Sequence, residues 1–419
     1  MKFTTSFLTF ALCLVFFPYG IRAVEPVDST TLHGKLMCGY QGWFHAEGDG
    51  TDFGWHHYNG KGGKFEPGCC SIDAWPDMSE MDEDEKYPTP FKHADGSTAH
   101  VFSSQNPKTV MRHFRWMEQY GLDGVFLQRF AVSVRNPKHR EFRQTVMANV
   151  RAGAEKHGRA WAMMYDLSGI GENELVRVVA EDWKRLVDED KIRDDKMYLH
   201  HNGKPVVSVW GIGFNDNRKY TLAECMELIA FLKDDPKYGG NTVMLGVPTY
   251  WRELHRDAVK DPLLHEIIKR ADIVSPWTVG RYGKPEQAKN YIEKTAAADL
   301  AWCKENGKEY LPVVFPGFSW HNLMKNRGQE APMGAIPRLK GQFLIDQIRG
   351  HLDNGSTMIY QAMFDEVDEA TAIFKCTNDP PVGESPFITY EGLPGDFYLK
   401  LLGKASKALK RKAGIGERQ

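Results

Sequence analysis

The sequence has almost no net charge and lacks the short motifs of several common protein classes. Its 53 Lys and Arg nearly balance 55 Asp and Glu, which gives a formal net charge of −2 at pH 7. A chain this close to neutral offers no electrostatic reason to bind nucleic acid or an anionic membrane. There is no Gly-x-Gly-x-x-Gly after the first predicted strand and no Gly-x-x-x-x-Gly-Lys-Ser/Thr, so nucleotide-binding folds lose support.

Motifs for metal sites and for serine hydrolases are also missing. The chain has no His-Glu-x-x-His, no Cys-x-x-Cys or Cys-x-x-His, and no Gly-x-Ser-x-Gly elbow. The adjacent pairs His56-His57 and His200-His201 are poor metal sites, because neighbouring side chains rarely face one ion. We therefore expect neither a metal nor a cofactor.

Long apolar runs are confined to the N-terminus. Residues 1–23 have a basic Lys2, a short apolar core at 7–17 and Ile21-Arg22-Ala23, which is typical of a secretory signal peptide. The apolar core is too short for a comfortable membrane span, and no later stretch could cross a bilayer. We expect a secreted or periplasmic protein whose mature chain is 24–419.

Cysteine is sparse for an exported chain. Six cysteines remain after the signal peptide, and an even number permits disulfides outside the cytosol. Their spacing is irregular, and Cys69-Cys70 in a Gly-rich loop is the first pair to check.

The rest of the chain is rich in apolar residues and follows a regular rhythm. At 419 residues and 42% hydrophobic content, it suits one large α/β barrel or two smaller domains. Apolar strand-like runs alternate with amphipathic helical stretches. The predicted strands are 35–44, 122–130, 159–166, 205–211, 242–251, 272–277, 310–315 and 357–364. The predicted helices are 107–121, 138–157, 172–188, 222–232, 262–270, 285–306, 339–352 and 397–410.

Short apolar strands without period-two alternation suit a parallel sheet that is buried on both faces. Eight βα repeats predict a (β/α)8 TIM barrel, with a doubly wound open sheet as the rival. The stretch 45–104 has no clear helical or strand period but contains many aromatic residues. We therefore expect an ordered, flap-like insertion over one end of a single catalytic domain.

Polar and aromatic residues gather where the predicted strands end. In a barrel these ends converge on one face, where barrel enzymes have their active sites. Trp and Tyr can stack on the apolar faces of sugars, while amide, guanidinium and carboxylate groups pair with hydroxyls. We expect an oligo- or polysaccharide to be bound by Tyr40, Gln41, Trp43, Gln128, Arg129, Tyr165, Asp166, Trp210, Tyr250, Trp251, Trp277, Trp320 and His321.

The last predicted strand leads into four carboxylates within five residues, 365–369. Glycoside hydrolysis needs two carboxyl groups with different proton affinities, about 5 Å apart in retaining enzymes. Glu366 and Glu369 are the catalytic candidates. On an extended strand these two side chains would point to opposite faces, so the chain must bend after Phe364.

The segment Glu366-Val-Asp-Glu369-Ala-Thr371 resembles the Glu-x-x-Glu-Gly-Thr signature of glycoside hydrolase family 99, the endo-α-mannosidases. Gly39-Tyr-Gln-Gly-Trp-Phe44, Tyr120-Gly-Leu-Asp-Gly-Val125 and Gln128-Arg-Phe130 are similar to proteins described as family 71/99-like. The likeness follows strand order over most of the mature chain, although only short motifs match closely. It departs at Val367-Asp368, where family 99 has Trp-His, and at Ala370, where family 99 has Gly. These departures bear on the substrate more than on the carboxylate pair.

The resemblance implies a retaining hydrolase in which the substrate's own 2-hydroxyl attacks the anomeric carbon. Carried over to this chain, Glu366 would deprotonate that hydroxyl, and Glu369 would serve as general acid and then as base. Two alternatives remain open: an inverting family 71-like glycosidase that uses Asp166 or Asp365, and a carbohydrate-binding barrel without catalysis. We expect a monomer, and the sugar and linkage stay undetermined.

Overall fold

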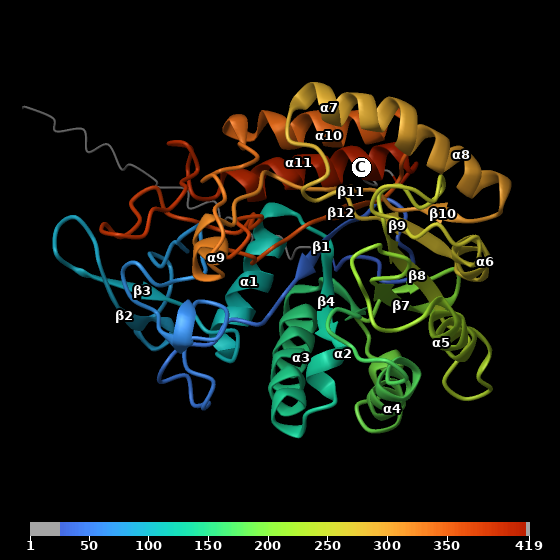
Figure 1. The fold of residues 1–419 in the computed structure, drawn as a ribbon, viewed down its shortest axis with the longest axis horizontal. Helices are drawn as coiled ribbons and strands as arrows, with labels where there is room; N and C mark the ends of the chain where they lie inside the picture. The colour runs from blue at the N-terminus through green and yellow to red at the C-terminus, as the bar shows by residue number, and fades with distance from the viewer. Residues whose placement is uncertain (1–25, 416–419) are drawn as a thin grey trace, which may run out of the picture.

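The computed structural model describes residues 26–415, and the predicted signal peptide at 1–23 lies outside them. A parallel sheet forms the centre of the molecule (Figure 1). Its strand order is β10-β9-β8-β7-β5-β4-β1-β12-β11, and the two-residue β6 (His200–His201) pairs antiparallel with β7. The bounds are β1 Leu36–Tyr40, β4 Gly124–Phe130, β5 Ala160–Asp166, β7 Lys204–Trp210, β8 Thr242–Val247, β9 Ile273–Pro276, β10 Glu309–Tyr310, β11 Val313–Val314 and β12 Ile359–Gln361.

One interrupted strand closes this sheet into a barrel. β10 pairs with β9 and β11 pairs with β12, and only Leu311 and Pro312 separate β10 from β11. The Leu311 N–H donates to Val274 O (2.9 Å), and Pro312 O accepts from the Tyr360 N–H (2.9 Å). The segment 309–314 therefore acts as a seventh strand that joins both edges. The predicted (β/α)8 barrel is confirmed.

Helices follow the strands and cover the outside of the barrel (Figure 1). Asn106 caps α1 by accepting from the Lys108 N–H, Pro107 takes the first helical position, and Gly121 ends the helix at φ 78°. The bounds are α1 Pro107–Tyr120, α3 Pro137–His157, α4 Leu175–Asp188, α5 Leu222–Asp234, α6 Leu263–Arg270, α7 Pro285–Tyr291, α8 Ala297–Glu305, α10 Gln342–Asp353 and α11 Phe397–Lys412. Two short helices, α2 (Ala131–Val134) and α9 (His321–Asn326), were not predicted.

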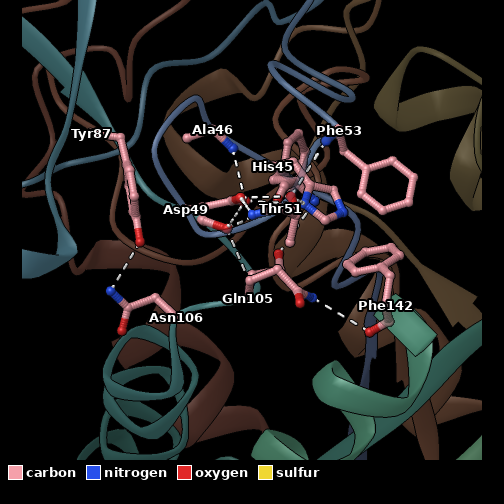
Figure 2. Close-up of polar contacts among 12 residues, drawn as sticks. His45, Ala46, Asp49, Thr51, Phe53, Tyr87, Gln105, Asn106 and Phe142 are labelled. Atoms are coloured by element: carbon pink, nitrogen blue, oxygen red, sulfur yellow. Dashed lines mark hydrogen bonds and ion pairs between the residues drawn. The ribbon is translucent and has the colours of Figure 1, made fainter. Parts of the chain in front are cut away.

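The insertion at 45–104 is largely irregular but contains a hairpin, β2 (Tyr87–Lys92) and β3 (Thr98–Val101), which lies to one side of the barrel (Figure 1). Its aromatic side chains are buried, pack around Phe65 and are continuous with the hydrophobic core of the barrel; they are Trp55, Tyr58, Phe65, Trp75 and Phe91. Figure 2 shows the base of the insertion, where the Asp49 carboxylate accepts from the backbone of Ala46 and Thr51.

The disulfide that the cysteines permit has no counterpart in the described part of the chain. All six cysteines within 26–415 are free thiols, and Cys70 Sγ lies 3.3 Å from Ser385 Oγ instead of bonding to Cys69. Between residues 26 and 415, no helix has the length and apolarity needed to cross a bilayer.

A buried ion pair fastens β4 and β5 to α4. Because side chains alternate along a strand, Gln128 points into the barrel and Arg129 points out to the helices. The Arg129 guanidinium donates to both carboxylate oxygens of Asp182 on α4 (2.5 and 2.8 Å), and the Tyr165 hydroxyl donates to the same carboxylate (2.8 Å). Arg129 is 2% exposed and Asp182 is fully buried.

Asp182→Ala should destabilise the protein by about 3–5 kcal/mol, because it leaves the Arg129 charge buried without a partner. Chemical denaturation would measure this change. The matched control is Glu181→Ala on the same helix, which removes only an exposed pair with Arg177 and should change little. Equal effects of the two substitutions would contradict the structural role of Asp182.

Candidate active site

The chain leaves the sheet after β12 and turns back on itself. The Phe364 N–H donates to Gly39 O (2.7 Å), residues 367–370 form a turn, and the Ala372 N–H closes it on Glu366 O (2.9 Å). This confirms the predicted bend after Phe364. Ala370 has a φ of 49°, a left-handed conformation that glycine adopts more easily. The departure from Gly at this position therefore costs backbone strain but leaves the turn in place.

Asp365 ties this turn to the end of β1. Its two carboxylate oxygens accept from the backbone N–H groups of Gln41 (2.8 Å) and Gly42 (2.9 Å). The side chain is fully buried, and burial raises its pKa to about 7 against the effect of these two donors. Because both of its oxygens are bound by backbone N–H groups, this carboxylate joins the turn to the end of β1, which is a positioning role.

Glu366 lies beside Asp365 and is held by two neutral donors. The Gln41 side-chain amide donates to Oε1 (2.6 Å), and the Thr371 hydroxyl donates to Oε2. Glu366 is 4% exposed, and burial raises its pKa well above the ordinary value, with further contributions from Glu369 and Asp368. Glu366 is thus a buried carboxyl group that accepts a hydrogen bond on each of its two oxygens.

Glu369 differs from Glu366 in its surroundings. It is partly exposed, and its carboxyl group has no hydrogen-bond partner among residues 26–415, so it is open to a ligand. Burial raises its pKa to about 7, and the neighbouring Asp368 carboxylate adds to this rise while Arg327 opposes it. The pair therefore consists of one enclosed carboxyl and one accessible carboxyl on the same turn.

Several of the predicted binding residues lie around this pair. Gln128 donates to the hydroxyl of Tyr360 (3.0 Å), and Tyr360 in turn contacts the ring of Trp277 (6.1 Å between centroids). Trp210 packs edge-on against Trp277 (5.5 Å) and is partly exposed. Asp166 ends β5, and burial raises its pKa. Gln41, Gln128, Asp166, Trp210 and Trp277 thus remain candidates to line the site.

The loop after β11 brings two more predicted residues next to Glu369. The Ser319 N–H donates to Glu369 O (3.0 Å), and Trp320 and His321 follow directly. His321 Nδ1 lies 2.7 Å from Ala331 O, and a cavity of about 680 Å³ opens beside His321 and Lys325. Tyr250 stands further round the rim, where its hydroxyl accepts from Arg256 (2.7 Å).

Four predicted binding residues point away from the strand-end face, and we remove them from the candidate set. The Tyr40 hydroxyl lies 2.8 Å from His113 Nδ1 on α1. Arg129 and Tyr165 both contact Asp182, and Trp251 packs against Trp302 on α8 (4.9 Å). Position in sequence marked them as strand-end residues, but strand alternation and the following turns direct their side chains to the helices.

Trp43 does not present the free indole face that stacking on a sugar ring would need. The imidazole of His57 lies flat against the indole at 3.8 Å and 7°, and Phe130 packs near it at 5.3 Å. Trp43 is only 9% exposed. A sugar would therefore meet the His57 ring rather than the indole.

Sequence reasoning missed two residues of the insertion. Asp73 accepts from the Ser319 hydroxyl and from the backbone N–H groups of His321 (2.6 Å) and Asn322 (2.8 Å), and its own N–H donates to Val367 O (3.0 Å). His57 Nδ1 lies 3.2 Å from Asp368 Oδ2. No local pattern could have found these contacts, since each joins segments about 250 residues or more apart.

Within residues 26–415, one cluster has the composition of a metal site, and it lies away from the carboxylates. His33, His201 and Glu309 bring their ligand atoms within 4.8 Å of one another. His201 Nδ1 accepts from the Leu32 N–H (3.0 Å), so its Nε2 carries the proton and donates to Glu309 (2.7 Å). A protonated Nε2 cannot ligate a cation, and the three residues instead form a hydrogen-bonded network.

No protein-family model and no curated protein matches the sequence. Among solved structures, the GH99 endo-alpha-mannosidase from Bacteroides thetaiotaomicron aligns with 92% of this chain and 100% of its own, at a TM-score of 0.63 and 14% identity. The chain has the fold of that enzyme. A second GH99 structure from the same organism, in complex with bis-tris-propane, gives a TM-score of 0.62 at 15% identity, covering 92% of this chain and 100% of that one. A glycoside hydrolase-like protein gives 0.52 at 16% identity, over 80% of this chain and 94% of that one.

These likenesses agree with the family resemblance read from the motifs, and at such low identity they establish the fold.

Glu369→Gln should stabilise the protein at pH 8 by about 2–3 kcal/mol and have little effect at pH 5. Glu369 titrates near 4.5 when unfolded and near 7 when folded. Between pH 4.5 and 7 the folded state holds a proton that the unfolded state has lost. The free energy of unfolding therefore falls as the pH rises towards 7 and stays low above it. Glutamine does not ionise, so the variant avoids this loss. Thermal melting at the two pH values would measure the difference. Glu330→Gln, at an exposed glutamate, is the control. A shift that is the same at both pH values would contradict the raised pKa.

Proposed function

We propose that the protein is a glycoside hydrolase that cleaves an oligosaccharide or polysaccharide with Glu366 and Glu369. The observation that carries this proposal is the pairing of an enclosed and an accessible carboxyl on one turn after β12, both with raised pKa values. Glycosidases need such a pair at the active face of the barrel. The partly exposed rings of Trp210, Trp277 and Trp320 supply apolar surfaces for sugar rings.

The resemblance of segment 366–371 to the family 99 signature supports a retaining route with participation of the 2-hydroxyl. In the first step Glu366 takes the proton of the substrate's 2-hydroxyl while that oxygen bonds to the anomeric carbon. Glu369 gives its proton to the leaving glycosidic oxygen as the bond breaks. In the second step water attacks the anomeric carbon and the bond between this carbon and the 2-oxygen breaks. Glu369 takes the water proton, and the 2-oxygen recovers its proton from Glu366.

Burial raises the pKa of both carboxyls, and hydrogen bonding favours this division of roles. The Gln41 amide and the Thr371 hydroxyl both stabilise ionised Glu366, whereas Glu369 has the Asp368 carboxylate beside it, which favours its protonated form. The charge of Glu369 raises the pKa of Glu366, so the two carboxyls compete for a proton. Once a sugar hydroxyl donates to Glu366, Glu366 is ionised and the proton lies on Glu369.

The GH99 likeness makes α-mannosides the first substrates to test. We further propose that residues 1–23 direct the protein out of the cytoplasm, and that the insertion at 45–104 forms one wall of the sugar site. The contacts of Asp73 and His57 with the loops after β11 and β12 support this second point.

Glu366→Gln and Glu369→Gln should each lower kcat/KM on the best glycan about 10²–10⁴-fold, which is the usual contribution of a positioned acid or base. A panel of glycans, with product analysis by chromatography, would find the substrate and measure the loss. Glu227→Gln, at an exposed glutamate on α5 outside the barrel, is the matched control and should keep full activity. Folding of both active-site variants is checked by circular dichroism. Full activity in both variants would contradict the catalytic roles of Glu366 and Glu369.

Proton NMR of the first-formed anomer then separates the mechanisms. Retention is expected from the 2-hydroxyl route. Inversion would instead favour a pair that includes Asp166 or Asp365, and sugar binding without any turnover would favour a non-catalytic barrel.

A further inference from the structure

The insertion places a histidine against the catalytic turn in a defined orientation. His57 Nδ1 lies 3.2 Å from Asp368 Oδ2, and the flat contact with Trp43 at 3.8 Å prevents the ring from rotating. His57 itself has a φ of 65°, so the backbone adopts a left-handed conformation to present this side chain. Asp368 is the residue directly before Glu369. The ring is therefore fixed next to the accessible carboxyl.

The opposite edge of this ring is free. His57 Nε2 has no hydrogen-bond partner among residues 26–415, and 26% of the side chain is exposed, compared with 6% for Asp368. Burial raises the pKa of Asp368 to about 7. Above that pH the ionised Asp368 carboxylate accepts from Nδ1–H and holds the neutral tautomer of His57 in which Nε2 is an acceptor. Burial lowers the pKa of His57 well below its usual value, and the Arg143 cation adds to this effect. The free edge is thus a neutral acceptor.

We propose that His57 Nε2 accepts a hydrogen bond from one hydroxyl of the sugar that occupies the site beside Glu369, and that the Asp368–His57 pair selects glycans in which this hydroxyl is free. This inference rests on the glycoside hydrolase function proposed above. A site that accepts a hydrogen bond from a hydroxyl discriminates against a sugar that lacks this hydroxyl. The bound sugar then covers Nε2 and leaves it without a partner. A sugar that is esterified or etherified at that position would also be refused, since it has no proton to donate.

A panel of monodeoxy analogues of the best substrate tests this proposal. With the wild-type enzyme, one analogue should lose about 10-fold in kcat/KM, which is the upper range for one neutral hydrogen bond. His57→Ala should lose a similar factor on the parent substrate and nothing further on that analogue. The loss should fall mainly on KM, whereas a general disturbance of the turn would lower kcat on every substrate.

His56→Ala is the matched control, because His56 is the adjacent histidine and has no contact with Asp368 in the described residues. It should keep the wild-type pattern over the panel. His57→Gln provides a second variant in case His57→Ala fails to fold, since its amide oxygen can reach the place of Nε2 and should recover part of the discrimination.

Two outcomes would overturn the inference in distinguishable ways. If the wild-type enzyme is active and the His57 variants show the same deoxy-sugar profile as wild type, His57 has no role in selection while the hydrolase function stands. If the wild-type enzyme hydrolyses no glycan, the proposed function and this inference fall together.

Discussion

Two backbone N–H groups at the end of β1 hold the carboxylate of Asp365, and the site depends on this contact. The same short segment supplies the Gln41 amide to Glu366, so one end of β1 orients both carboxylates. Gly42 makes the close approach possible, because it stands at a φ of 53° with Val146 packed where a side chain would begin. A barrel strand, a turn and a carboxylate are thereby joined into one rigid unit.

That unit places four carboxyl groups in a small, partly water-excluded space. Burial raises the pKa of each of them, and mutual repulsion adds to the effect for Glu366 and Glu369. An array of this kind weakens the fold at alkaline pH, where the groups must ionise. Functional sites often retain such costs, since a carboxyl that keeps its proton near neutral pH can act as an acid.

The insertion changes this turn from a simple loop into an enclosed site. Asp73 binds the loop after β11 and also meets Val367, while His57 meets Asp368. Asp368 stands where the family 99 pattern has histidine, and in this chain a histidine from the insertion is its partner. The departure from the signature therefore has a local explanation in the structure.

The sequence was sufficient for the barrel, for the bend after Phe364 and for the position of the carboxylates, because these depend on apolar periodicity and on local spacing. It was insufficient for the direction of strand-end side chains. Gln128 and Arg129 are neighbours in sequence, yet one faces the barrel interior and the other binds Asp182 on α4. It was also insufficient for His57 and Asp73, whose partners lie far away in the chain.

The proposed mechanism needs two carboxyl groups with raised pKa values, and titration of Glu366 and Glu369 in the folded protein would measure both. Carbon-13 NMR of protein labelled at the glutamate side-chain carboxyl, assigned with the Glu366→Gln and Glu369→Gln variants, would follow both groups without any substrate. Both groups should titrate well above 4.5, with Glu369 near 7. Titration of both groups at about 4–5, the ordinary range of glutamate, would contradict the proposed mechanism.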